Sequence, residues 1–96
     1  MITSKQRAYL RGLANKETAI MQVGKGGVTE PLLSTLSDAL EARELIKLHV
    51  LENSGFSPRE LLSALCEELG AEPVAAVGRK IVLYRASSKE PVIVLP

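Results

Sequence analysis

Residues 18–31 read TAIMQVGKGGVTEP, and this stretch indicates how the chain folds. The apolar run 18–23 is short and is ended by glycines, which is typical of a buried strand. A glycine-rich loop occupies residues 24–27. Residues 29–31, Thr-Glu-Pro, then form a helix start, because proline is tolerated in the first turn, where its missing amide has no partner to lose. Strand, loop and helix in this order predict an α/β fold.

Helices and strands alternate on both sides of this stretch. Before it, Thr3 or Ser4 can cap an amphipathic helix that runs to about Ala14. After it, leucines at helical spacing continue the second helix to about Ala42. Residues 44–51 alternate apolar and polar side chains, which predicts a strand with one face in the core.

The C-terminal half begins with residues 57–60, Ser-Pro-Arg-Glu, which match a capping box for a third helix ending at Gly70. Two strands, 72–77 and 80–86, are separated by Gly78 and Arg79, a spacing that suits a tight hairpin. Residues 91–95 are expected to add a weak edge strand. We expect Ser87 and Ser88, which precede it, to be mobile.

The expected order is helix, strand, helix, strand, helix, strand, strand, which gives a four-stranded mixed sheet with packed helices. The 96 residues suit one domain, 1–96, in which 87–96 form a tail. No apolar stretch is long enough to span a bilayer, and residues 1–7 turn polar at once, unlike a signal peptide. Cys66 is the sole cysteine and cannot form an internal disulfide, so we expect a cytoplasmic protein.

The net charge of +1 hides a strong polarity along the chain. Residues 1–29 carry five basic side chains against one acidic, and residues 73–96 carry four against one. Residues 30–72 carry three basic side chains against nine acidic ones. If the two basic ends meet in space, they form a surface that attracts phosphate. The alternative is that the charges scatter over a solvated surface.

The sequence lacks the residues from which a catalytic or metal site could be built. The chain has a single histidine and a single cysteine, and no carboxylates at metal-ligand spacing, so neither a metal site nor a nucleophile with its base can be assembled. We therefore expect no catalysis, cofactor, metal or small-molecule substrate. His49 is expected to be a surface or partly buried strand residue, with a phosphate contact as the alternative.

The loop Gly24-Lys25-Gly26-Gly27 matches neither the NTPase nor the dinucleotide glycine pattern. It is a Gly-x-x-Gly loop before a helix, where glycines allow close backbone approach and the helix end is expected to present unpaired amides. KH domains clamp single-stranded nucleic acid with such a loop. A flexible turn remains the alternative interpretation, and we expect no binding of ATP or GTP.

Four ordered segments resemble the CRM domain, named for chloroplast RNA splicing and ribosome maturation, and in particular its stand-alone bacterial YhbY-like form. They are residues 4–14, 23–29, 44–47 and 77–85, which include Leu83-Tyr84-Arg85. The resemblance covers residues 2–86. It implies a fold akin to the C-terminal domain of bacterial translation initiation factor 3, RNA binding, and association with precursors of the large ribosomal subunit.

The resemblance places the glycine loop on Gly24, Lys25, Gly26 and Gly27, although the role of Lys25 is argued from its charge alone. It places basic first-helix positions on Lys5, Arg7 and Arg11, and a signature position on Arg85. With Arg79 and Lys80 these residues form the expected RNA-binding surface. We expect a monomer that binds ribosomal RNA of the large-subunit precursor and no membrane. The alternative is an adaptor whose acidic middle block, with Glu67, Glu68 and Glu72, docks a basic ribosomal protein.

Overall fold

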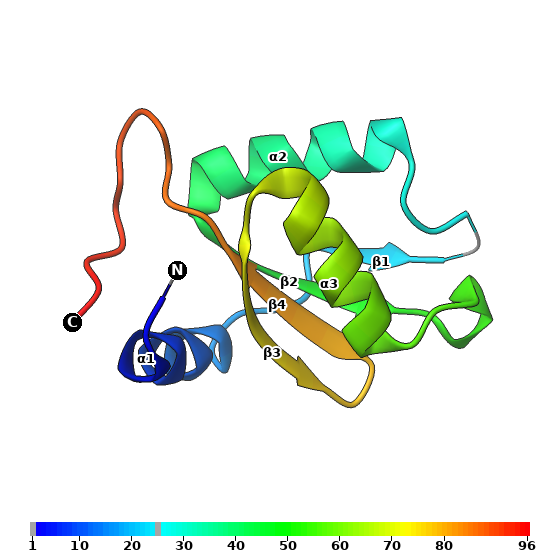
Figure 1. The fold of residues 1–96 in the computed structure, drawn as a ribbon, viewed down its shortest axis with the longest axis horizontal. Coiled ribbons are helices and arrows are strands. Elements are labelled where there is room, and N and C mark those ends of the chain that lie inside the picture. The colour runs from blue at the N-terminus through cyan, green and yellow to red at the C-terminus, as the bar shows by residue number, and fades with distance from the viewer. Residues whose placement is uncertain (1, 25) are drawn as a thin grey trace.

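The structure, a computed structural model, describes residues 2–24 and 26–96 of the chain. Figure 1 shows its helices and strands in chain order. They are α1 (Ser4–Ala14), β1 (Met21–Val23), α2 (Glu30–Arg43), β2 (Leu45–Val50), a 3-10 turn η1 (Glu52–Ser54), α3 (Pro58–Leu69), β3 (Glu72–Val77) and β4 (Lys80–Tyr84). The expected order of helices and strands is confirmed, with β1 shorter than the predicted run 18–23.

The four strands form one mixed sheet in the order β1-β2-β4-β3. β1 is parallel to β2, and the other neighbours are antiparallel. Helices α2 and α3 pack on one face of the sheet and α1 on the other. The structure therefore has a core on both sides of the sheet, and the prediction that only one face of residues 44–51 is buried was incomplete, because Leu45 packs against the α1 side.

The helix boundaries follow from local chemistry that the sequence shows. The Thr3 hydroxyl accepts a hydrogen bond from the Gln6 amide at 3.1 Å, while the Gln6 side chain accepts one from the Thr3 amide at 3.0 Å. Ser57 and Glu60 form the same reciprocal pair at the start of α3. Gly70 ends α3 with φ 65°, a left-handed conformation that favours glycine. The predicted capping box and terminator are confirmed.

The C-terminal tail was predicted wrongly in two respects. Residues 91–95 form no strand, because the amides of Val92 and Ile93 donate to the Glu44 carboxylate, at 2.6 and 2.7 Å, and not to a neighbouring strand. Ser87 is buried, and its amide also donates to Glu44, at 2.7 Å, so this turn is held in place. The tail then packs Ile93 and Leu95 against the α1 side of the core.

Glu44 links the second helix, the sheet and the tail. It follows the last turn of α2 with φ 65°, and its side chain is almost fully buried. Burial raises the pKa of the Glu44 carboxyl, but the amides of Ile93, Ser87 and Val92 together lower it further, so the net pKa lies below its ordinary value. A buried carboxylate is tolerated here because three backbone donors solvate it.

Candidate nucleic-acid interface

The glycine loop forms a shallow hollow of about 250 Å³ between the end of β1 and the start of α2. Gly24, Gly26 and Gly27 line it, together with Gln22 and Thr29. Lys25 lies outside the described residues. Gly26 and Gly27 have φ values of 116° and 55°, and the Gly27 amide donates to the Gly24 carbonyl at 3.2 Å. Glycine is therefore required for the shape of this turn.

The Phe56 ring covers one side of the loop. A Cβ atom added at Gly27 would lie 2.9 Å from Cζ of Phe56 and closer still to Cε2, so this glycine is also required by a close approach. The ring itself is partly exposed. Residues 54–56 are fixed by the Ser54 hydroxyl, which accepts from the Phe56 amide at 3.2 Å and donates to its carbonyl at 3.3 Å.

The start of α2 presents fewer unpaired backbone amides to an anion than the sequence predicted. The Thr29 hydroxyl already accepts from the Leu32 amide at 3.3 Å, and Pro31 has no amide hydrogen. The Leu33 amide donates to the Thr29 carbonyl. The expectation of unpaired amides at this helix end was therefore wrong for most of the first turn, and the exposed loop backbone is what remains available to a ligand.

A row of polar side chains crosses the sheet from the glycine loop. Gln22 on β1 lies opposite His49 on β2, and His49 lies opposite Lys80 on β4. Directly opposite residues in a sheet point to the same face, and here it is the α1 face, because the alternate residues Leu48 and Ile81 lie in the α2–α3 core. The three strands place these side chains within about 10 Å of one another, at roughly 4.8 Å per strand.

This row leads into a groove between α1 and the sheet, which we call the helix–sheet groove. Its volume is about 190 Å³, and it is lined by Arg11 and Asn15 from α1 and by Lys47 and Lys80 from the sheet. Lys47 donates to the Glu17 carbonyl at 3.1 Å. Among the described residues, none of these cations pairs with a carboxylate. The groove therefore gathers positive charge from three segments of the chain.

Arg7 continues the basic side of α1 one turn before Arg11. Its Nε atom donates to the Pro73 carbonyl at 3.2 Å, so its guanidinium lies against the start of β3. Lys5 is exposed on the same helix but lines none of the grooves described here. The structure thus brings Arg7, Arg11 and Lys80 together on one side of the sheet and leaves Lys5 apart.

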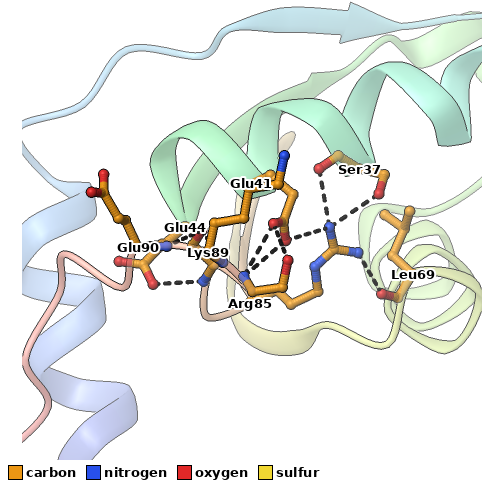
Figure 2. A network of polar contacts seen from close by, with 9 residues as sticks. Ser37, Glu41, Glu44, Leu69, Arg85, Lys89 and Glu90 are labelled. Carbon is orange, nitrogen blue, oxygen red and sulfur yellow. Dashed lines mark hydrogen bonds and ion pairs between the residues drawn. The ribbon is translucent and has the colours of Figure 1, made fainter.

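Arg85 has a structural role that the sequence did not reveal. Figure 2 shows its guanidinium between α2 and the end of α3. It donates to the Leu69 carbonyl at 2.9 Å and to the Ser37 carbonyl and hydroxyl at 3.0 Å, and it pairs with Glu41 at 3.4 Å. These bonds hold the guanidinium between α2 and α3, so the structure does not place it on the expected surface.

Arg79 is likewise engaged within the chain. Its Nε and Nη2 atoms donate to the carbonyls of Val50 and Leu51 at 2.9 and 2.8 Å. These carbonyls belong to the segment that leaves β2 toward Phe56, and the Leu51 amide donates to the Val23 carbonyl, just before the glycine loop. Arg79 therefore braces the segment beside the loop, and its side chain is half-buried.

Part of the acidic middle block is engaged in bonds within the chain. Glu44 holds the tail, and Glu41 accepts from the Ser88 hydroxyl at 2.6 Å and pairs with Arg85. Glu60 caps α3, and Glu72 accepts from the Ile2 amide at 2.9 Å. Four of the nine carboxylates are thus engaged, while Glu67 and Glu68 lie exposed on α3.

Sequence reasoning missed two cations that line the basic grooves, Lys47 on the α1 face of the sheet and Arg59 on α3 at the edge of β3. Lys47 and Arg59 lie in the acidic block, and a count by chain segment assigned both to its negative charge. The signal that could have found Lys47 is strand alternation, which puts it on the opposite face from Ile46 and Leu48. Nothing in the sequence indicated that Arg59 lines the same groove as Arg7 and Arg11.

A metal site or a reactive nucleophile finds little support in the described ranges 2–24 and 26–96. They contain no group of three or more His, Cys, Asp or Glu side chains placed to hold a metal ion. Burial raises the pKa of the Cys66 thiol to about 12, with Glu72 adding to the shift. A thiol with a raised pKa is a poor nucleophile at neutral pH. In the same ranges, no helix has the length and apolar character needed to cross a bilayer.

Comparison with known proteins identifies the family. The model of the CRS1 / YhbY (CRM) domain matches residues 2–85. The chain belongs to this family. The resemblance noted from four sequence segments is therefore confirmed, and the mixed α/β fold with it.

Full-length relatives carry the same domain. The Bacillus subtilis (strain 168) protein named "Probable RNA-binding protein YqeI" is 42% identical over 96 residues, which cover all of both chains. A Haemophilus influenzae protein named "RNA-binding protein" is 34% identical over 88 residues, which cover 92% of this chain and 89% of that one. The names of these relatives assign RNA binding to CRM domains of the same length.

A solved structure shows the same CRM fold. The solution structure of the hypothetical protein SAV1595 from Staphylococcus aureus superimposes with a TM-score of 0.79 and 41% sequence identity, and it covers all of both chains. The order of helices and strands described above is therefore that of an experimentally determined relative.

Proposed function

We propose that this chain is a non-catalytic RNA-binding protein that associates with the ribosomal RNA of large-subunit precursors in the cytoplasm. The observation that carries the proposal is the polar row Gln22, His49 and Lys80, which connects the glycine-loop hollow to the basic helix–sheet groove. The RNA-binding names of full-length relatives support the binding activity. The ribosomal target rests on the resemblance to YhbY-like proteins.

The surface suits a sugar-phosphate backbone better than a set of base edges. Its cations, Arg11, Lys47 and Lys80, line one groove and can each approach a phosphate. The exposed backbone of Gly26 allows a chain to approach closely at the glycine-loop hollow. Phe56 is the one exposed aromatic side chain beside the loop, so base stacking is limited and the readout of sequence is weak.

The proposed surface predicts a strong dependence on salt. Each phosphate contact with a single strand adds roughly 0.7 to the slope of log affinity against log salt. Replacing Arg11 and Lys80 together by glutamine should lower that slope by about 1.4 and weaken binding at least tenfold at about 0.1 M salt. The measurement is fluorescence anisotropy with a labelled fragment of large-subunit ribosomal RNA at four or more salt concentrations.

A matched control removes the same charge elsewhere. Arg43 on α2 and Lys89 in the tail are both exposed and line neither the glycine-loop hollow nor the helix–sheet groove. The Arg43→Gln/Lys89→Gln variant should keep nearly the full slope. Equal losses in both double variants would show that net charge alone is measured, and the assigned surface would be wrong.

The ribosomal target requires an experiment in cells. Crosslinking of RNA to the tagged protein, followed by mapping of the crosslinked positions, should recover large-subunit ribosomal RNA. Recovery of unrelated RNAs alone would refute the target and leave the RNA-binding surface untouched. The adaptor alternative rests on Glu67 and Glu68, which are exposed, because Glu72 accepts from the Ile2 amide within the fold. Partners that survive thorough nuclease treatment in a pull-down would support it.

A further inference from the structure

A basic groove runs along the outer edge of β3, away from the glycine loop. We call it the edge-strand groove, and its volume is about 430 Å³. Its floor is the strand itself, residues 73–77, and its two sides are helices from opposite faces of the sheet. Arg7 and Arg11 come from α1 on one side, and Arg59 and Ser63 come from α3 on the other.

The charge of this groove is of one sign. Three guanidinium groups line it and no carboxylate does. Glu60, the neighbour of Arg59, points its carboxylate at the Ser57 amide, at 3.1 Å. Within the part of the chain that the structure describes, neither Arg7, Arg11 nor Arg59 forms an ion pair. Three uncompensated arginines around one groove favour an anionic occupant, because guanidinium groups bind phosphate with two parallel hydrogen bonds.

An unpaired strand edge could instead accept a peptide as an additional strand, but three features of β3 oppose this. Pro73 removes one donor from the edge region, and the pairing register shifts between Pro73 and Ala75. Arg7 already occupies the Pro73 carbonyl. Proline, an irregular register and a covering charged side chain are the devices by which proteins prevent edge pairing. The groove is therefore unsuited to an added peptide strand and suited to an anionic chain.

The edge-strand groove is continuous with the helix–sheet groove, since Arg11, Ala75 and Val77 line both. Val77 lies opposite Lys80, so the polar row across the sheet ends where the edge-strand groove begins. Val77 is 63% exposed and leaves this junction open. A chain that follows the row from the glycine loop and passes over Val77 therefore reaches the outer edge of the sheet.

We propose that the RNA backbone continues past Lys80 and wraps around the β3 edge, where Arg59 binds a phosphate from the far face of the sheet. This inference rests on the proposed RNA-binding function and extends it to a second subsite. The groove follows residues 73–77 for roughly 13 Å, at about 3.3 Å per residue. The protein then contacts RNA on two sides of its sheet, and Arg59 belongs to the binding residues.

The test compares Arg59→Gln with Arg43→Gln, which removes the same charge from an exposed position outside the groove. The probe is a labelled single-stranded oligouridylate of 20 nucleotides. Arg59→Gln should weaken binding by about threefold to tenfold and lower the salt slope by roughly 0.7, the value for one phosphate contact with a single strand. Arg59→Lys keeps the charge and should restore the slope, while losing part of the affinity because lysine cannot bind bidentately.

The outcomes separate this inference from the proposed function. If Arg59→Gln behaves as Arg43→Gln does while Arg11→Gln/Lys80→Gln loses binding, RNA binding stands and the edge subsite is refuted. If the unmodified protein binds neither the oligouridylate nor ribosomal RNA, both proposals fail. If it binds a heptaglutamate peptide through Arg59 in place of RNA, the groove serves a protein partner and the inference is overturned. Urea unfolding of each variant shows that the fold is intact.

Discussion

Replacing Glu44 by glycine sets two effects against each other, and the structure predicts which is larger. Glu44 has φ 65°, a conformation that glycine adopts without strain, so the change should relieve about 1–2 kcal/mol of backbone strain. The same change removes the carboxylate that accepts from the amides of Ser87, Val92 and Ile93. A rule based on backbone conformation alone predicts stabilisation.

The hydrogen bonds decide the sign of the change. A bond to a charged group contributes about 1.5–3 kcal/mol, and three such bonds exceed the relief of strain even at the low end of that range. We expect Glu44→Gly to lower the free energy of unfolding by about 3 kcal/mol or more. Glu44→Gln keeps the shape but leaves its amide hydrogens facing a backbone donor, and we expect a loss of about 2–3 kcal/mol. For a domain of this size, 3 kcal/mol corresponds to roughly 12–24 °C in Tm.

Urea unfolding followed by circular dichroism, with Glu90→Gln as the control, measures these differences. Glu90 is an exposed glutamate in the same tail, so its replacement should change the free energy of unfolding by less than about 0.5 kcal/mol. The expected order of stability is the unmodified protein, then Glu44→Gln, then Glu44→Gly. If Glu44→Gly is as stable as the unmodified protein, the carboxylate does not hold the tail and the reasoning is refuted.

Three further predictions follow from described contacts. Gly27→Ala should lower the free energy of unfolding in urea by about 2–4 kcal/mol, because its φ of 55° is left-handed and the new methyl group meets the Phe56 ring. Adding Phe56→Ala should give a double variant whose loss is smaller than the sum of the two single losses. Strictly additive losses would contradict the contact. The folded-state pKa of Glu44 lies below its unfolded value, so the stability it contributes is present above the ordinary carboxyl range and is lost as the pH falls below about 4. The Tm measured between pH 7 and pH 3 should therefore fall less steeply in Glu44→Gln than in the unmodified protein. Parallel curves would argue against the shift. Cys66 is buried with a pKa raised to about 12, so a thiol-reactive dye at pH 8 should label it only after denaturation, and rapid labelling of the native protein would show that the thiol is accessible.

Much of the fold could be predicted because local chemistry marks the ends of its helices. Ser57, Glu60 and Gly70 satisfy or terminate backbone groups within a few residues, and such signals are visible in sequence. The tail could not be predicted in this way. Its amides bind Glu44, more than forty residues away in the chain, and the short apolar run in residues 91–95 resembled an edge strand of the sheet.

The candidate site was predicted in part for a related reason. Charge counted along the chain located Arg11 and Lys80, whose segments do meet on one side of the sheet. It also selected Arg85, whose guanidinium instead joins two helices, because a sequence does not show which arginines are enclosed. It passed over Arg59, whose acidic neighbour Glu60 is engaged in a cap and does not cancel its charge.

The glycine loop is attached to a strand of only three residues at the edge of the sheet. Around this strand, the Ile20 amide donates to the Lys47 carbonyl and the Leu51 amide donates to the Val23 carbonyl. So few bonds at an edge can open without disturbing β2, β3 or β4, and we expect amides of residues 20–23 to exchange with solvent sooner than those of the central strands. Binding of a chain at the glycine-loop hollow should slow this local exchange.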